Sequence, residues 1–146
     1  MPTLNPVWRN ELYVGTSMSG TSWVYSKLCA GIESMEFQSG EQNQQFFFLC
    51  GNGYAHNETT GSAPQVSCSG RRIVGDTAQD YIAGKQFALG PDRNTSVKII
   101  AEGKQIICDA TIGEVVSFGG SALDVNNFSC TLYFNGQPTM EAAPAQ

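Results

Sequence analysis

Apolar and polar residues alternate along the last third of the chain, from Ser96 to Thr139. A period of two residues sends alternate side chains to opposite faces of a strand, so this pattern predicts half-buried β-strands. The alternation breaks at sequences typical of turns, which are Glu102-Gly103, Gly119-Gly120 and Asn135-Gly136-Gln137-Pro138. These features together predict a β-meander or β-sandwich.

The upstream half predicts shorter strands separated by polar segments. The predicted strands are Glu11 to Gly15, Trp23 to Ile32 with an extension over Glu33 to Phe37, and Gln65 to Arg72. The continuous apolar run from Phe46 to Cys50 predicts a strand covered on both faces, with a neighbouring subunit or the helix as its second cover. The segments Ser39 to Gln45 and Gly51 to Pro64 show no periodicity and predict polar loops.

One helix is predicted from about Thr77 to Leu89. Asp76 or Thr77 is a suitable N-cap, and Gly90-Pro91 is a stop signal. The fold expected is therefore mainly β, with two packed antiparallel sheets in a sandwich or barrel and one flanking α-helix. A chain of 146 residues is expected to form one domain. We assign this domain to residues 8–139, between an N-terminal arm at 1–7 and a C-terminal tail at 140–146.

The surface is expected to be polar but weakly charged. Charged residues make up 14% of the chain, against about 25% in an average soluble domain. The net charge is −5, and the largest basic cluster is Arg71-Arg72. Tight binding to a nucleic-acid backbone needs clustered cations, so it is not expected here. A surface of this kind suits a protein that packs against copies of itself, and also many plain secreted β domains.

The five cysteines are expected to be reduced and structural; they are Cys29, Cys50, Cys68, Cys108 and Cys130. Their number is odd, no CxxC spacing occurs, and most lie in or beside apolar strand patterns, where a free cysteine acts as a small buried apolar residue. His56 is the single histidine, so no zinc site is expected. No apolar signal region and no run of about 18 apolar residues occurs, so neither a signal peptide nor a membrane span is expected.

Candidate chemistry is sparse. A nucleophilic site could pair His56 with Cys50 or Glu58, and this is the enzyme hypothesis. A carbohydrate-binding or adhesin-type β-sandwich is the alternative hypothesis, in which aromatic residues form a platform for sugars; these are Trp8, Trp23, Tyr25 and Tyr54. No phosphate-binding loop or dinucleotide fingerprint is present, so no enzymatic activity and no cofactor are expected.

Three stretches resemble the major tail tube proteins of long-tailed, non-contractile bacteriophages. They run from Trp23 to Phe37, from Ser69 to Ile82 and from Phe128 to Pro138. The resemblance implies a structural virion protein that forms hexameric rings stacked into a tail tube, through which DNA passes without specific binding. It implies contacts with the tape measure, tail terminator and distal tail proteins, assembly in the bacterial host cytoplasm, a final place in the virion tail, and no membrane.

Candidate residues follow from this resemblance together with the strand pattern. A lumen that lets DNA pass should be neutral to acidic, and the acidic residues on predicted strands or their ends are Glu33, Glu36, Asp109, Glu114 and Asp124. Contacts between subunits or between rings are expected from the apolar run, the long loops and the arginine pair; the candidates are Phe46, Phe47, Phe48, Tyr54, His56, Arg71 and Arg72.

Overall fold

The computed structural model describes residues 3–142 of the chain. In this part the strands are β1 (Glu11–Ser19), β2 (Ser22–Lys27), β3 (Ile32–Gln38), β4 (Glu41–Phe47), β5 (Ala55–Ser62), β6 (Gln65–Arg71), β7 (Asn94–Ala101), β8 (Lys104–Val116) and β9 (Asn127–Ala142). The α-helix α1 spans Thr77–Gly84, and short 3-10 helices lie at η1 (Val7–Arg9), η2 (Leu49–Gly51) and η3 (Gly90–Arg93). The ends of the predicted arm and tail, residues 1–2 and 143–146, lie outside the described residues.

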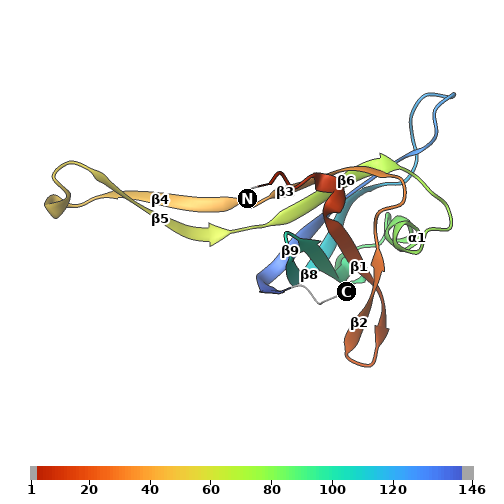
Figure 1. Ribbon diagram of the computed structural model, residues 1–146, viewed down its shortest axis with the longest axis horizontal. Helices are drawn as coiled ribbons and strands as arrows, with labels where there is room; N and C mark the ends of the chain where they lie inside the picture. Colours follow the sequence, from red (N-terminus) through yellow and green to blue (C-terminus); the bar gives the residue numbers. More distant parts are fainter. Residues whose placement is uncertain (1–2, 143–146) are drawn as a thin grey trace.

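Seven strands form one antiparallel sheet in the order β2-β1-β7-β8-β9-β6-β3. Strands β2 and β3 follow one another in the sequence but lie at opposite edges of this sheet. The predicted single strand from Trp23 into Phe37 is therefore two strands, which part at the turn Cys29–Gly31. Strands β4 and β5 form a separate hairpin that projects from one end of the molecule (Figure 1).

The seven-stranded sheet is rolled on itself. Four strands separate β1 from β3 in the sheet order, yet Leu12 of β1, Met35 of β3 and Cys68 of β6 line one pocket of about 300 Å³. The inward side chains of the sheet therefore share a single core with Leu28, and with Ala78 and Ile82 of α1. The buried apolar strand positions are Leu12, Val14, Val66, Cys68, Val97, Ile99, Cys108, Ala110, Ile112, Val115, Phe128, Cys130, Leu132 and Phe134.

A mainly β fold with one helix and two sheets is confirmed, but the second sheet is the projecting hairpin. Every residue of β4 is exposed, and of β5 all but Gly61. A hairpin without an apolar face has nothing to bury against the main sheet. The core is closed instead by the rolling of the main sheet and by α1.

The predicted loops at Ser39–Gln45 and Gly51–Pro64 are wrong in their central parts, which are β4 and β5. The prediction failed because both faces of this hairpin are polar, so no alternation marks the strands. The predicted strand over Phe46 to Cys50, covered on both faces, is also wrong. The strand ends at Phe47, and the apolar run forms the exposed tip of the hairpin.

The predicted turn from Asn135 to Pro138 lies inside β9. Ile107 pairs with Thr139 and Asp109 with Asn135, so a short stretch of β8 faces a longer stretch of β9. This is a β-bulge, in which Gly136 takes a positive φ of 81°. Strand β9 then continues to Ala142, three residues beyond the expected boundary at 139. Glycine and proline here mark a local kink rather than the end of a strand.

The helix is shorter than expected and ends at Gly84 instead of Leu89. Its start is as predicted, since the Asp76 carboxylate accepts a hydrogen bond from the Gln79 backbone amide at 3.2 Å. Glycine disfavours continuation of a helix. Beyond it, Arg93 donates to the carbonyl oxygens of Gln86 at 2.6 Å and Ala88 at 2.7 Å, and so fixes a non-helical path.

A buried glutamine fastens α1 to the rolled sheet. The Gln79 side chain is fully buried, and its Nε2 donates to the carbonyl oxygens of Ala30 at 2.7 Å and Arg71 at 3.1 Å. Its Oε1 accepts from the Ile73 amide at 2.8 Å. One side chain thus joins the helix, the turn before β3 and the end of β6.

All five cysteines are free. Cys68, Cys108 and Cys130 are buried as expected, whereas Cys29 and Cys50 are exposed. The expectation of burial is wrong for these two because Cys29 lies in the turn between β2 and β3 and Cys50 at the hairpin tip. Cys68 and Cys130 are paired neighbours across β6 and β9 in the core.

We expect Gln79→Leu to lower the free energy of unfolding by about 2–4 kcal/mol, because it leaves a buried amide and two buried carbonyl groups without partners. Gln44→Leu on the exposed strand β4 is the matched control and should change it by less than about 0.5 kcal/mol. Urea denaturation of the unassembled protein measures both. Equal effects would show that Gln79 does not fasten the helix.

The buried thiol of Cys68 predicts a loss of stability at alkaline pH. Burial raises the pKa of the Cys68 thiol from 9.0 to about 12. The folded state therefore holds this proton more tightly than the unfolded state, so stability is full below about pH 9 and falls as pH rises toward 12. At about pH 10.5 the parent should have lost roughly 2 kcal/mol more than Cys68→Val. Parallel pH profiles would contradict this assignment.

Candidate assembly surfaces

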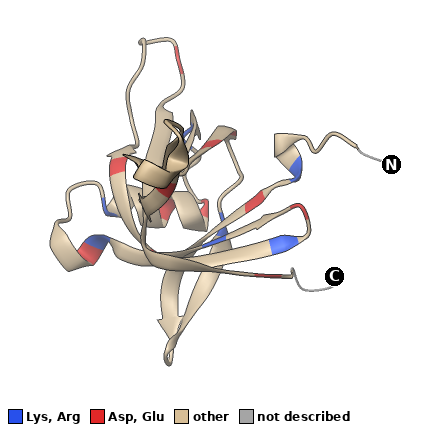
Figure 2. Cartoon of the chain, turned by 90° about the vertical axis from the view of Figure 1, so that its left-hand side faces the viewer, with Lys and Arg blue, Asp and Glu red and all other residues tan. Residues whose placement is uncertain are grey.

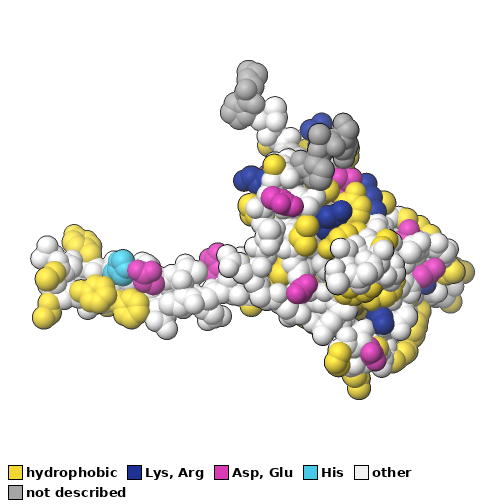
Figure 3. All heavy atoms as spheres, turned by 90° about the horizontal axis from the view of Figure 1, so that it is seen from below, with side chains coloured by type: hydrophobic (Ala, Val, Ile, Leu, Met, Phe, Trp, Pro, Cys, Tyr) yellow, Lys and Arg dark blue, Asp and Glu magenta, His cyan; other side chains and the backbone are white. Residues whose placement is uncertain are grey.

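The hairpin tip gathers exposed aromatic and apolar side chains. Phe47 is 67% exposed, Leu49 104% and Tyr54 80%. Phe46 stacks on Phe48 with ring centroids 5.9 Å apart, and the Phe48 ring lies 5.8 Å from the His56 ring. Figure 3 shows this apolar cluster at the far end of the arm, separated from the body by polar surface. Exposed apolar groups gathered in this way mark an interaction site.

The hairpin carries acidic charge and neither lysine nor arginine. Lys27 and Arg71 are the nearest such residues on either side of it in the sequence, whereas Glu41 and Glu58 lie within it. Glu58 Oε1 is 2.6 Å from His56 Nε2, and both side chains are more than half exposed. Over the body, Lys and Arg are scattered rather than clustered (Figure 2). This pattern differs from that of a nucleic-acid interface.

A second surface lies on the outward face of β3, β6, β9 and β8, and we call it the hydroxyl wall. It is a shallow groove of about 380 Å³ whose hydroxyl residues are Ser34, Ser67, Ser69, Ser129 and Thr131. The Thr131 hydroxyl donates to Glu114 Oε2 at 3.1 Å and lies 3.2 Å from the Ser67 hydroxyl. Among the described residues, two carboxylates line the groove, those of Glu36 and Glu114, and no lysine or arginine does.

The structure brings together some of the candidate acidic residues. Glu36 and Glu114 line the hydroxyl wall, and Glu114 reaches it from a bulge in β8 where its φ is 51°. Glu33 lies at the start of β3, with its carboxylate 3.6 Å from Arg71. Asp109 is an exposed residue of β8 and does not line the hydroxyl wall. Asp124 lies apart, in the loop between β8 and β9, where it accepts from the Ser121 amide at 3.2 Å.

The arginine pair has internal partners. Arg71 donates to Asn127 Oδ1 on the neighbouring strand, and Arg72 donates to Asp80 at 2.8 Å. The Arg72 guanidinium, aided by the Gly75 amide, holds the pKa of Asp80 below its usual value. These contacts fasten the segment between β6 and α1. The two arginines therefore have structural roles, and a role between subunits stays a prediction.

The aromatic platform of the carbohydrate-binding hypothesis does not come together, whereas the His56–Glu58 pair of the enzyme hypothesis is in contact. Trp8 lies on η1, Tyr54 at the hairpin tip and Trp23 and Tyr25 on β2, so these aromatic rings are spread over distant elements (Figure 1). Tyr25 is engaged with Ser96, their hydroxyl oxygens being 2.9 Å apart. His56 contacts Glu58 in the open, at the end of the arm. Across residues 3–142, no group of three His, Cys, Asp or Glu side chains could hold a metal ion.

No helix within the described chain has the length and apolar character needed to cross a membrane.

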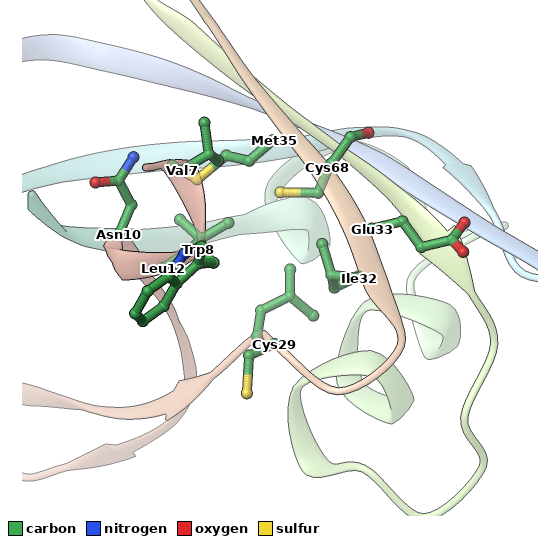
Figure 4. A pocket seen from close by; sticks show the side chains of 11 residues that line it. Val7, Trp8, Asn10, Leu12, Cys29, Ile32, Glu33, Met35 and Cys68 are labelled. Atoms are coloured by element: carbon green, nitrogen blue, oxygen red, sulfur yellow. The ribbon is translucent and has the colours of Figure 1, made fainter. Parts of the chain in front are cut away.

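Sequence reasoning missed the hydroxyl wall and the pocket beneath η1. The wall could have been found from its sequence, because Ser67 and Ser69 alternate with Val66 and Cys68 on one strand, and Ser129 and Thr131 with buried residues on another. The pocket could not have been found. Its lining combines η1 and the turn before β3 with residues of β1, β3 and β6 (Figure 4), and only the rolling of the sheet brings these three strands together.

No family model matches the sequence, and no curated protein matches it. Solved structures match over nearly the whole chain. One is the tail of an empty gene transfer agent particle with C6 symmetry, with a TM-score of 0.69 and 14% identity over 90% of this chain and 96% of that one. Another is the tube-terminating cap of the anti-feeding prophage, with a TM-score of 0.61 and 13% identity over 98% of this chain and 94% of that one.

A third match is the sheath–tube complex of an extracellular contractile injection system, with a TM-score of 0.57 and 16% identity over 96% of this chain and 93% of that one. One of these three structures is described as contractile, so the restriction to non-contractile phages implied by the sequence resemblance is not supported. At such low identity the matches establish the fold alone. The chain has a tail-tube-like fold, and its structural neighbours are components of phage-tail-like particles.

Proposed function

We propose that this protein is the structural subunit of a phage-tail-like tube, built from stacked hexameric rings, without restricting it to one class of tail. The observation that carries the proposal is an acidic hairpin with an exposed aromatic tip on a chain of tail-tube-like fold. Such a tip has no cover on its own subunit. A neighbouring subunit covers it, and a repeated head-to-tail contact of this kind builds a ring or a filament.

The sheet edges support ring formation. Strands β2 and β3 are the two ends of the seven-stranded sheet, so each has an edge without a partner strand in the described part of this chain. Open edges invite pairing with another chain, and closure into a ring removes them. The gene transfer agent tail of similar fold has C6 symmetry, which agrees with a six-fold ring. In this arrangement the tape measure, tail terminator and distal tail proteins are partners at the lumen and the ends of the tube.

We assign the hydroxyl wall to the lumen. Serine and threonine hydroxyl groups, with the carboxylates of Glu36 and Glu114, give a surface that is wet, neutral to acidic and free of clustered cations. DNA carries a dense negative charge, so such a surface lets it slide past without being held. The protein would thus act as a conduit for DNA delivery in the virion tail, after assembly in the host cytoplasm.

The hairpin tip should be needed for assembly but not for folding. We expect a triple substitution of Phe47, Phe48 and Leu49 by serine to give a folded subunit that no longer forms tubes, because these side chains are exposed in the single chain. Circular dichroism and thermal unfolding report folding, and negative-stain microscopy at high protein concentration reports tubes.

The matched control is Val74→Ser with Met140→Ser, which removes exposed apolar side chains elsewhere on the surface. This variant should still form tubes. Normal tubes from the tip variant would contradict the role of the hairpin tip in assembly.

Cations on the hydroxyl wall should make the tube hold DNA. We expect Ser69→Lys with Ser129→Lys to leave assembly intact and to give tubes that retain DNA, with a salt dependence that reflects phosphate contacts. The control Ser19→Lys with Ser22→Lys places the same charges on the exposed turn between β1 and β2. DNA retained per particle, measured after ejection at several salt concentrations, decides the matter. Equal retention by both variants would place the hydroxyl wall outside the lumen.

A further inference from the structure

The aromatic cluster at the hairpin tip contains one ring that can take up a proton. His56 is the single histidine of the chain, and its Nε2 lies 2.6 Å from Glu58 Oε1. The ring of His56 also lies 5.8 Å from that of Phe48, which stacks on Phe46. Figure 3 shows the histidine near the end of the arm, beside an acidic side chain and the apolar side chains of the tip. Histidine is the side chain whose charge ordinarily changes between pH 5 and pH 8.

The hairpin places His56 and Glu58 together and gives them no other charged neighbour. They are two residues apart on β5, so both side chains project from the same face of the strand. Their partners across the hairpin, on β4, are Phe46 and Gln44, and Phe48 faces the ring from just before η2; none of these side chains ionises. The hairpin has neither lysine nor arginine. Its other ionisable side chains are Glu41, Cys50 and Tyr54.

The added proton goes to Nδ1 of the ring. An ionised carboxylate only accepts hydrogen bonds, so the neutral imidazole donates its Nε2 hydrogen to Glu58 and keeps a lone pair on Nδ1. A proton from water adds to that lone pair, and the ring becomes a cation without losing its contact with Glu58. The pair thereby changes from a carboxylate beside a neutral ring to an ion pair without net charge.

Cover by a second copy makes the two protonation states differ in energy. In the single chain both side chains are more than half exposed, so water stabilises either state and the ion pair contributes little. The cover removes this water. Burying a carboxylate without a cation is costly, and burying it with a hydrogen-bonded cation costs less. A covered tip therefore favours the protonated ring.

We propose that His56 takes up a proton when a neighbouring copy covers the hairpin tip, and that tube assembly therefore depends on pH. This inference rests on the proposed function, to which it adds a proton-linked step. The sign follows from linkage, because the covered tip binds more protons than the free one. A fall in pH through the range in which histidine titrates should accordingly stabilise the tube.

The single histidine allows a direct test. Pelleting and negative-stain microscopy give the critical concentration, the protein concentration above which tubes form, at several pH values between about 6 and 8. For the parent this concentration should be roughly three- to tenfold lower at pH 6 than at pH 8. His56→Gln cannot take up the proton, so its critical concentration should change less than about twofold over the same range. Groups that titrate elsewhere in the chain are common to both proteins.

Glu58→Gln gives the sharpest contrast, because it should reverse the sign. Its tip pair is uncharged at pH 8 and carries an imidazolium without a carboxylate at pH 6, so the critical concentration should rise as pH falls. Glu41→Gln is the matched control, since it removes the same charge from the other end of the same hairpin. It should keep the pH dependence of the parent. An unchanged pH dependence in Glu58→Gln would overturn the pairing of His56 with Glu58.

The outcomes separate the proton-linked step from the tube itself. Tubes whose pH dependence is the same in the parent and in His56→Gln would overturn the proposal and leave the tube function intact. A critical concentration of the parent that rises as pH falls would overturn it as well, because the covered tip would then bind fewer protons than the free one. Absence of tubes at every pH and concentration would count against both the proposal and the function.

Discussion

The subunit carries an acidic two-stranded hairpin that its own chain does not cover, and the proposed assembly follows from this exposure. A two-stranded hairpin alone is marginally stable in water, and this one has an aromatic cluster at its end. Within the described part of the subunit its strands pair only with each other. The subunit therefore has a closed core, but its hairpin and apolar tip remain exposed to solvent. Assembly with further copies would cover them.

The body of the protein is organised so that the arm can be dispensable for folding. One sheet rolls until β1 and β3 approach the same pocket, and α1 closes the core with Ala78 and Ile82. Gln79 fastens this closure through backbone groups of three separate segments. Since the hairpin contributes nothing to this core, its sequence is free to serve contacts outside the subunit. The two faces of the sheet also carry different chemistry, because alternate residues of β6 and β9 enter the core and those between them include Ser67, Ser69, Ser129 and Thr131. Core and proposed conduit wall thus arise from one alternating pattern.

The sequence predicted those parts of the fold in which burial leaves a pattern. Strands such as β7 and β9 alternate because one face is in the core, and the N-cap at Asp76 has a recognisable local signal. Strands β4 and β5 were not predicted, because both of their faces are exposed and their sequences therefore lack the alternation of apolar and polar residues that marks a half-buried strand. Among the candidate site residues, Phe46, Phe47 and Phe48 were identified from their apolar run. That run was predicted to be a strand covered on both faces, whereas it forms the exposed tip of the hairpin. The pocket beneath η1 depends on long-range rolling of the sheet, which no local pattern encodes.

In the proposed tube, neighbouring copies cover the arm. Hydrogen exchange of the amides in residues 41–62 is the decisive measurement, because exchange reports both the pairing of the hairpin and its cover. We expect fast exchange in the dilute, unassembled protein and strong protection in the assembled tube, while the core strands β7 to β9 are protected in both. Equal exchange of the hairpin amides in the two states would contradict this cover.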